Sequence, residues 1–276
     1  MIKIFVDSGS SIKSHELQKY GVGFLPLKVY LKGVEYDDGI NLPYDDFYKA
    51  LIEEKLFPKT SLPSMTDAEQ KVLEYTNAGY DVLIITISSG LSGTYNAMKQ
   101  FFAGNEKVRV IDSKTAVGGV RILVEEMNKH LDDTLDEAEA RLNAIIPKIR
   151  VVAIPETLEY LHRGGRLSRA AWIFGSILQL KPLLQLGGAD GKVLVIGKER
   201  GKVRAMKALA AYLSEMRCDE NYPIIPSYTY NSRNLDELLS FTDEKFKAQM
   251  AERDDLDPAI ACHWGPGAFG YIFVAK

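Results

Sequence analysis

A turn rich in serine and glycine, residues 88–97, offers the clearest chemistry in this sequence. It follows the apolar run 81–87 and precedes a helical pattern, so a strand, a tight turn and a helix start are expected. Hydroxyls and free backbone N–H groups at such a helix start suit a carboxylate or a phosphate. The same residues could serve only to cap the helix and turn the chain. The turn is therefore a candidate anion site that its own residues leave undecided.

The overall composition limits the functions to consider. The chain has 276 residues, of which 46% are hydrophobic and 26% charged, and its formal net charge is -3. This argues against a general nucleic-acid binder, which is usually basic. Cys218 and Cys262 belong to no metal-binding pattern, and no apolar run approaches the roughly 18 residues of a membrane span. We expect a cytoplasmic protein of about two domains, without a signal peptide, a membrane span or a metal.

Strand and helix patterns alternate through the first half of the chain. Strands are expected at 2–6, 23–31, 81–87 and 108–112, and helices at 14–20, 42–54, 66–79, 94–102 and 116–129. This alternation predicts an α/β fold with a Rossmann-like, mainly parallel sheet flanked by helices, whose ligand crevice lies beyond the carboxyl ends of the strands. The loops at Ser8, Thr60, Ser92 and Asp112 would converge there. Residues 57–64 are expected to form a plain connection.

A change of pattern near residue 150 indicates a domain boundary. We place one domain at 1–149 and a second α/β domain at 150–276. In the second, Asp190-Gly191 predicts a hairpin between strands 182–186 and 192–196, so its sheet is expected to be mainly antiparallel. The other elements expected are strands at 150–155, 223–230 and 270–275, helices at 170–180, 202–216 and 235–253, and a loop at 262–268.

Five short motifs together indicate a family. They are Asp7-Ser8, Thr60-Ser61-x-Pro63-Ser64, residues 88–95, Leu161-x-x-Gly164-Gly165-Arg166 and His263-x-Gly265-Pro266-Gly267. Each is weak alone, but their order and separations across nearly the whole chain resemble the DegV family of bacterial fatty-acid-binding proteins. Leu62 departs from the commoner family pattern, in which a polar residue often stands at that position of the loop.

The resemblance implies a carrier protein and not an enzyme. Members of the family hold one long acyl chain in a tunnel and present its carboxylate to a separate fatty acid kinase, which forms an acyl phosphate for phospholipid synthesis. The resemblance also implies two domains with the ligand tunnel between them and no cofactor. A parallel layer followed by an antiparallel one agrees with the element pattern described above.

The resemblance further implies which residues hold the carboxylate. The matching head-group positions are Thr60, Ser92, Arg166 and His263, and the supporting positions are Ser61, Gly93 and Thr94. A carboxylate that enters a partly dry site needs donors, and a charged arginine or histidine supplies charge-assisted hydrogen bonds. Structural roles remain as alternatives: an ion pair for Arg166, a turn position for His263 and a helix cap for Thr60.

An unusually apolar helix at 170–180 offers candidate tunnel-wall residues. They are Trp172, Ile173, Phe174 and Ile177. An ordinary hydrophobic core explains such a helix as well as a ligand tunnel does.

Basic residues cluster around the start of the helix at 202–216. Arg200 and Arg204 in this cluster are candidate docking residues for the kinase, because a basic patch on an acidic protein can steer an acidic partner. A solvated helix face is the alternative.

A serine-dependent acyl hydrolase or acyltransferase is the main rival function. In it, Ser92 would be the nucleophile, His263 its base and the Ser92-Gly93 turn the oxyanion hole. The sequence contains no GxSxG motif, and no acidic residue is evident as the third member of a triad. An adaptor without a ligand is a third possibility, which would leave the hydroxyls and the arginine without a function.

Overall fold

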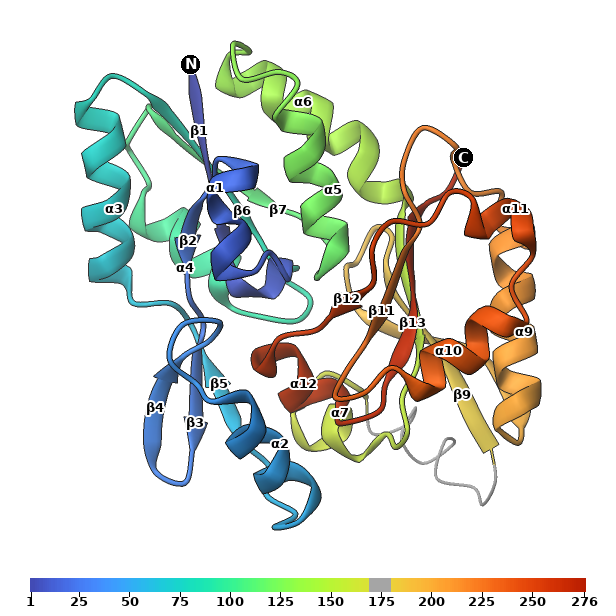
Figure 1. Cartoon of the computed structure of the whole chain (residues 1–276). Helices are drawn as coiled ribbons and strands as arrows, with labels where there is room; N and C mark the ends of the chain where they lie inside the picture. The colour runs from blue at the N-terminus through green and yellow to red at the C-terminus, as the bar shows by residue number, and fades with distance from the viewer. Residues whose placement is uncertain (169–179) are drawn as a thin grey trace.

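The first layer of the molecule is a four-stranded parallel sheet. The computed structural model describes residues 1–168 and 180–276. Within them, the first sheet has the strand order β2-β1-β6-β7 (Figure 1). Its strands are β1 (Ile2–Asp7), β2 (Gly23–Leu25), β6 (Asp81–Thr86) and β7 (Val108–Asp112). The central strands β1 and β6 are aliphatic and buried on both faces, as is usual for parallel strands.

Helices cover both faces of this sheet, because strand side chains alternate between them. Val82 and Ile84 pack in one cluster with α3 (Met65–Asn77) and α4 (Thr94–Phe101). Leu83 and Ile85 pack in another with α5 (Gly118–Met127) and α6 (Leu135–Ile145). The remaining short helical segments of this half are η1 (Ser8–Ser10), η2 (Ser14–Glu16), α1 (Leu17–Tyr20) and η3 (Ile146–Lys148).

A small antiparallel sheet, which the sequence reasoning did not foresee, extends below the first one (Figure 1). Its order is β4-β3-β5, formed by β3 (Lys28–Leu31), β4 (Val34–Asp37) and β5 (Lys59–Ser61), with α2 (Tyr44–Ile52) between β4 and β5. The expected strand 23–31 is therefore two strands, which separate at Pro26. The expected plain connection 57–64 contains β5, because Thr60 pairs with Val29 at long range.

The second large sheet has six strands, in the order β10-β9-β8-β13-β11-β12. They are β8 (Ile149–Ile154), β9 (Leu180–Gly187), β10 (Val193–Arg200), β11 (Ile225–Tyr228), β12 (Asp254–Asp255) and β13 (Phe269–Val274). All neighbours are antiparallel except β11 and β12. The predicted hairpin around Asp190-Gly191 is confirmed by the pairing of β9 with β10.

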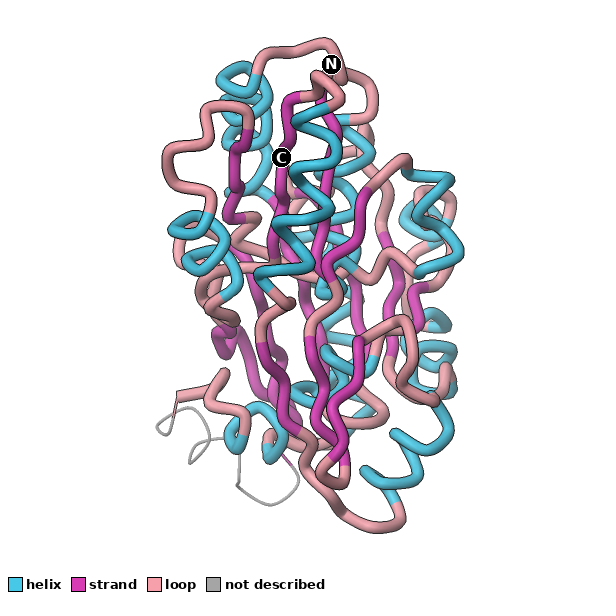
Figure 2. Tube along the Cα trace, turned by 90° about the vertical axis from the view of Figure 1, so that its left-hand side faces the viewer, coloured by secondary structure: helices cyan, strands magenta, loops and turns pink. Residues whose placement is uncertain are grey.

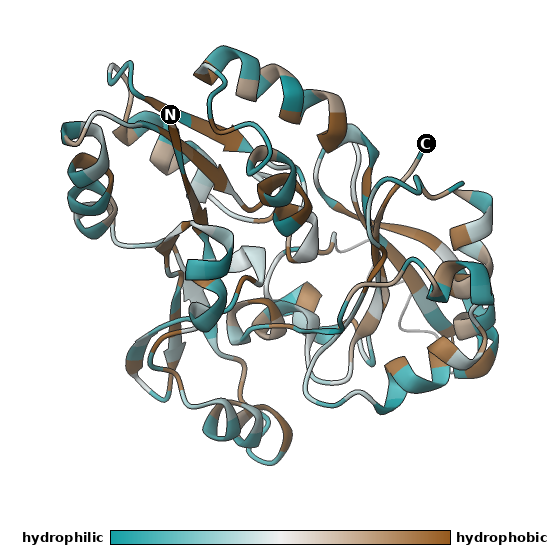
Figure 3. Cartoon of the chain, turned by 45° about the horizontal axis from the view of Figure 1, so that its top comes forward, coloured by the Kyte–Doolittle hydropathy of each residue, from teal (hydrophilic) through white to brown (hydrophobic). Residues whose placement is uncertain are grey.

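The outer face of the six-stranded sheet is covered by α9 (Lys202–Glu215), α10 (Arg233–Ser240) and α11 (Glu244–Lys247). Its inner face shares one buried apolar cluster with α5 and the first sheet, in which Leu186 and Ile272 lie together with Leu83. Strands therefore lie between flanking helices (Figure 2), and apolar residues concentrate on the strands (Figure 3). The α/β fold with a parallel and a mainly antiparallel sheet is confirmed, while the boundary at residue 150 stays a prediction.

Two expected elements of the C-terminal half are corrected. The single helix expected at 235–253 is broken into α10 and α11, because Asp243 starts a new helix by accepting a hydrogen bond from the backbone N–H of Lys245. The loop expected at 262–268 begins inside α12 (Pro258–Trp264), so His263 is helical.

The other short helix of this half is α7 (Glu159–Arg163). The expected helix 170–180 lies outside the described residues, apart from Leu180, which starts β9. None of the described helices is both long and apolar enough to span a membrane.

Buried carboxylates gather where the two halves of the chain meet. Asp254 is 3% exposed, and its Oδ2 atom has no hydrogen-bond partner among the described residues. Burial raises the pKa of Asp254 to about 7, although the nearby positive charges of Arg121 and Lys13 act in the opposite direction. Lys13 forms an ion pair with Asp257, with 2.7 Å between Nζ and Oδ1. The two cations thus offset only part of the cost of burying the Asp254 carboxyl.

We expect Asp254 to make the folded state less stable as the pH rises. Its pKa is higher in the folded than in the unfolded chain, so the folded state loses stability between about pH 4 and pH 7. Asp254→Asn cannot ionise. We therefore compare the free energy of unfolding of the variant with that of wild type at pH 4.5 and at pH 7.5. The variant should gain on the order of a few kcal/mol over wild type between these pH values, since each pKa unit is worth about 1.4 kcal/mol. Urea unfolding at both pH values measures this.

Asp45→Asn, at an exposed position of α2, is the matched control. The same pH-dependent difference in both variants would contradict a specific effect of the buried carboxylate.

Candidate functional site

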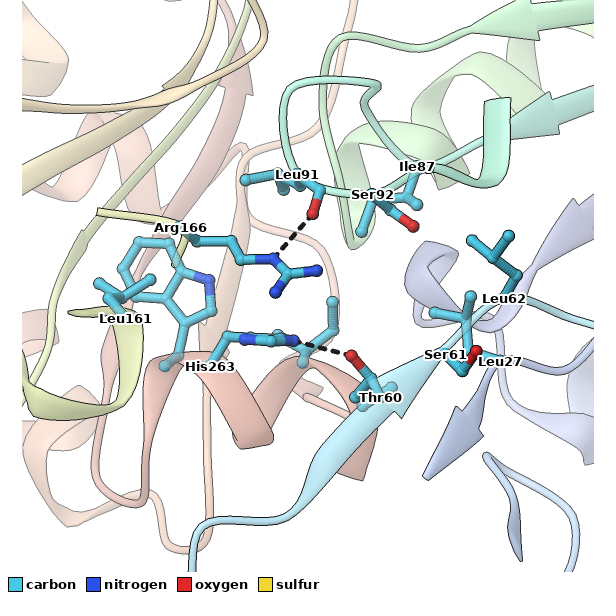
Figure 4. A pocket seen from close by; sticks show the side chains of 14 residues that line it. Leu27, Thr60, Ser61, Leu62, Ile87, Leu91, Ser92, Leu161, Arg166 and His263 are labelled. Carbon is cyan, nitrogen blue, oxygen red and sulfur yellow. Dashed lines mark hydrogen bonds between the residues drawn. The ribbon is translucent and has the colours of Figure 1, made fainter. Parts of the chain in front are cut away.

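The predicted head-group residues line one cavity of about 240 Å³ (Figure 4). Thr60 comes from β5, Ser92 from the turn after β6, Arg166 from the segment after α7 and His263 from α12. The supporting residues Ser61 and Gly93 also line it, whereas Thr94 is fully buried and is not among the lining residues. No described lining residue is acidic, and the rest of the lining is mainly aliphatic.

Thr60 and His263 form the hydrogen bond that joins the small sheet to α12. The distance between Thr60 Oγ1 and His263 Nε2 is 2.9 Å. The other ring nitrogen, Nδ1, is buried and has no hydrogen-bond partner among the described residues. Gly164 packs so closely against the ring that a Cβ atom there would lie 2.3 Å from Nδ1. A glycine at this position of the Gly-Gly-Arg motif is therefore required by the approach of its backbone to the imidazole.

The imidazole of His263 is neutral at physiological pH. Burial lowers its pKa to about 4, and the positive charge of Arg166 contributes in the same direction. A neutral imidazole offers one donor and one acceptor. The positive charge that either residue was expected to supply therefore comes from Arg166.

Arg166 is half-buried and is oriented by backbone carbonyls. Its Nε donates to Leu91 O at 2.8 Å, and one terminal nitrogen donates to Gly164 O. These two bonds connect the end of α7 with the turn after β6, and the guanidinium faces the cavity beside the imidazole (Figure 4). Burial lowers the pKa of Arg166, but an arginine remains protonated in proteins. None of the ion pairs among residues 1–168 and 180–276 includes Arg166.

Buried side chains hold the turn that carries Ser92. Asp7 accepts a hydrogen bond from the N–H of Ile87 at 2.8 Å, and Asp112 accepts one from the N–H of Ser89 at 2.9 Å. Ser88 Oγ donates to the carbonyl of Gly191 in the β9–β10 connection at 2.6 Å. The Asp7 and Asp112 side chains therefore act at the carboxyl ends of β1 and β7, where the alternating pattern predicted a crevice.

The hydrolase hypothesis requires a hydrogen bond between Ser92 and His263, and the structure shows other partners for both side chains. Ser92 Oγ is hydrogen-bonded to Thr94 Oγ1 at 2.8 Å, and His263 is hydrogen-bonded to Thr60. A nucleophile and its base are expected within hydrogen-bond reach of one another. In the observed pairs, Ser92 and His263 each have a different partner, although both line the same cavity.

A second, apolar cavity of about 30 Å³ adjoins the first. Ile260 and Trp264 of α12 line both cavities. The second is enclosed by Val117, just before α5, and by side chains on the inner face of the six-stranded sheet such as Val151 and Leu186. The first cavity is thus polar and positively charged at Arg166, and its neighbour between α5, α12 and the sheet is apolar.

Several lining residues were missed by the sequence reasoning. Leu161, Ile260 and Trp264 line the site, while the proposed tunnel-wall residues Trp172, Ile173, Phe174 and Ile177 lie outside the described residues. The signal for α12 was present: Asp257 followed by Pro258 is a common helix start, and an apolar run follows it. Two predicted docking residues, Arg200 at the end of β10 and Arg204 on α9, are exposed and do not line either cavity.

Comparisons with known proteins agree with this architecture. A curated fatty acid-binding protein of Thermotoga maritima is 28% identical over 286 residues, which cover 98% of this chain and 96% of that protein. The crystal structure of a fatty acid binding DegV family protein from Streptococcus agalactiae has a TM-score of 0.88 at 25% identity. A stearic acid-binding protein from Eubacterium ventriosum has a TM-score of 0.86 at 25% identity. Each structure covers 100% of this chain, which in turn covers 99% of each of them.

A family model also matches the whole length of the chain. The family described as "Uncharacterised protein, DegV family" matches residues 1–276. This match includes all five motifs and every described residue of the cavity. The chain belongs to the DegV family.

Proposed function

We propose that this chain binds one long-chain fatty acid, with its carboxylate among Thr60, Ser92, Arg166 and His263. One observation carries the proposal: a cavity with a positive charge and polar side chains shares Ile260 and Trp264 with an adjoining apolar cavity. This order matches a ligand with one anionic end and a long apolar body. The fatty acids named for the Thermotoga, Streptococcus and Eubacterium relatives support the same ligand class.

The free energy of binding favours a long acid over a short one. About 15 methylenes at roughly 0.8 kcal/mol each contribute about 12 kcal/mol when they leave water. That exceeds several kcal/mol of lost translational and rotational freedom. A short acid would depend on its head group alone, because it could not reach the second cavity. The small volume of that cavity means that side chains such as Trp264 must shift to admit an acyl chain.

We further propose that the chain is a cytoplasmic carrier that presents the carboxylate to a separate fatty acid kinase. In this scheme the carrier needs no cofactor, and the kinase performs the phosphoryl transfer. The resemblance of the five motifs to fatty-acid-binding DegV proteins supports the scheme, and the exposed Arg200 and Arg204 offer a basic surface for docking. A serine-dependent hydrolase or acyltransferase is the rival that the experiments below also address.

Removal of either head-group hydroxyl should weaken fatty-acid binding. Ser92→Ala and Thr60→Ala each leave the anion short of one donor, so we expect a loss of roughly 1 to 3 kcal/mol in binding free energy. Titration with a fluorescent fatty acid measures it. Ser89→Ala is the matched control, since this hydroxyl belongs to the same turn but does not line the cavity. Unchanged affinity in both head-group variants would place the carboxylate elsewhere.

The role of His263 separates a carrier from a catalyst. His263→Gln keeps a donor for Thr60 and the ligand, so it should retain more fatty-acid binding and more kinase-dependent acyl phosphate formation than His263→Ala. A hydrolase would lose activity in both variants, because glutamine cannot act as a base. The measurements are binding, acyl phosphate formation with kinase, ATP and Mg²⁺, and ester hydrolysis by the chain alone. Ester hydrolysis by wild type that both substitutions abolish would favour the rival function.

Reversal of the basic surface should affect the kinase reaction alone. With Arg200→Glu and Arg204→Glu together, we expect fatty-acid binding within about twofold of wild type and at least a tenfold loss of acyl phosphate formation at low salt, because the attraction of an acidic partner is lost. Lys19→Glu with Lys129→Glu, at two exposed positions that line neither cavity, is the control of equal charge change. Equal kinase turnover in both double variants would exclude this surface from docking.

A further inference from the structure

A buried carboxylate from the N-terminal half holds the start of α12. Asp38 follows β4 directly and is 0% exposed. Its Oδ1 accepts a hydrogen bond from the backbone N–H of Ala259, in the first turn of α12, at 3.0 Å. The backbone N–H of Asp38 donates to Leu27 O at 2.9 Å. One residue thus connects the helix that carries His263 to the chain segment that forms the small sheet.

The same two elements meet again at the head-group site. His263 lies four residues after Ala259, which is about one turn further along α12, and its ring reaches Thr60 on β5. Asp37, which precedes Asp38, and Ser61, which follows Thr60, both pair with Lys28 of β3. Asp38, directly after β4, and Thr60 therefore lie one position to either side of the row that contains Lys28. The Asp38–Ala259 and Thr60–His263 bonds are two contacts between this sheet region and α12.

The other polar contacts at this junction hold the segment before the helix. Lys13 forms an ion pair with Asp257 and donates to the carbonyl of Asp255, and the hydroxyl of Tyr44 donates to the Asp255 carboxylate. Asp257 occupies the N-cap position, but its side chain makes no capping bond. Asp38 supplies a bond to the first helical turn in its place.

The environment of Asp38 is unfavourable for a residue whose only role is stability. Its Oδ2 atom has no hydrogen-bond partner among the described residues. Burial, with a contribution from the negative charge of Asp257, raises the pKa of this carboxyl to about 7, although Ser8 and Lys13 act in the opposite direction. A buried, incompletely paired carboxylate usually costs stability compared with an apolar side chain. A requirement for position explains its presence better than a requirement for stability.

We propose that Asp38 is a positioning residue of the head-group site, which fixes α12 against the small sheet so that His263 meets Thr60 and the bound carboxylate. The inference rests on the proposed fatty-acid function of these two residues. Asp38 does not line either cavity, so it acts through Ala259 and the helix and does not touch the ligand.

A double-mutant cycle on the full chain tests this role. Asp38→Ala removes the acceptor for Ala259, and we expect about tenfold weaker binding of a fluorescent fatty acid. In a His263→Ala background the same substitution should change affinity less than threefold, because α12 then has no head-group donor to position. Asp38→Asn keeps an oxygen acceptor of the same reach and should bind within about threefold of wild type.

The outcomes of the cycle distinguish a failure of the positioning role from a failure of the proposed fatty-acid function. A tenfold loss that is equal in both backgrounds would overturn positioning while the fatty-acid function stands. Failure of wild type to bind the fatty acid would overturn both. If Asp38→Ala does not fold, Asp38→Ser, whose oxygen is one bond shorter, takes its place in the cycle with the same expected outcomes.

Discussion

A half-buried positive charge is the constraint on which the site depends. Arg166 is oriented by the carbonyls of Leu91 and Gly164, which direct the guanidinium without neutralising it. The lining residues within 1–168 and 180–276 include no acid, and burial keeps the neighbouring His263 neutral at physiological pH. Removing a charge from water is costly unless an opposite charge joins it. Among the residues that the structure describes, the pocket lining therefore carries a positive charge with no acidic partner, which the carboxylate of the proposed ligand would balance.

The fold brings distant segments together around this charge. Thr60, Ser92, Arg166 and His263 arrive on four different elements, and each element is tied to another by a hydrogen bond at the site: Thr60 to His263, and Arg166 to the turn of Ser92. The adjoining apolar cavity lies within the core that both large sheets share. A charged cavity next to an apolar one favours an amphipathic anion over a phosphate or a small acid.

The two large sheets could be predicted from the sequence more readily than the residues that line the cavity. Aliphatic runs and the Asp190-Gly191 turn depend on local chemistry, so the parallel layer and the β9–β10 hairpin were predictable. The three-residue strand β5 was missed because its pairing with β3 is between residues about 30 positions apart. The neutral state of His263 was equally inaccessible, since it results from burial and from Arg166. The strand–helix alternation predicted that the loops of Thr60 and Ser92 converge, whereas the addition of Arg166 and His263 came from the family resemblance.

The most direct test of the central claim is native mass spectrometry of the purified chain with an equimolar mixture of palmitic acid, butyric acid and hexadecanol. Palmitic acid has both features that the cavities select, whereas butyric acid lacks the long chain and hexadecanol lacks the negative charge. We predict a single adduct with the mass of one palmitic acid per chain. Absence of that adduct, or equal binding of hexadecanol, would contradict a site built around the positive charge of Arg166.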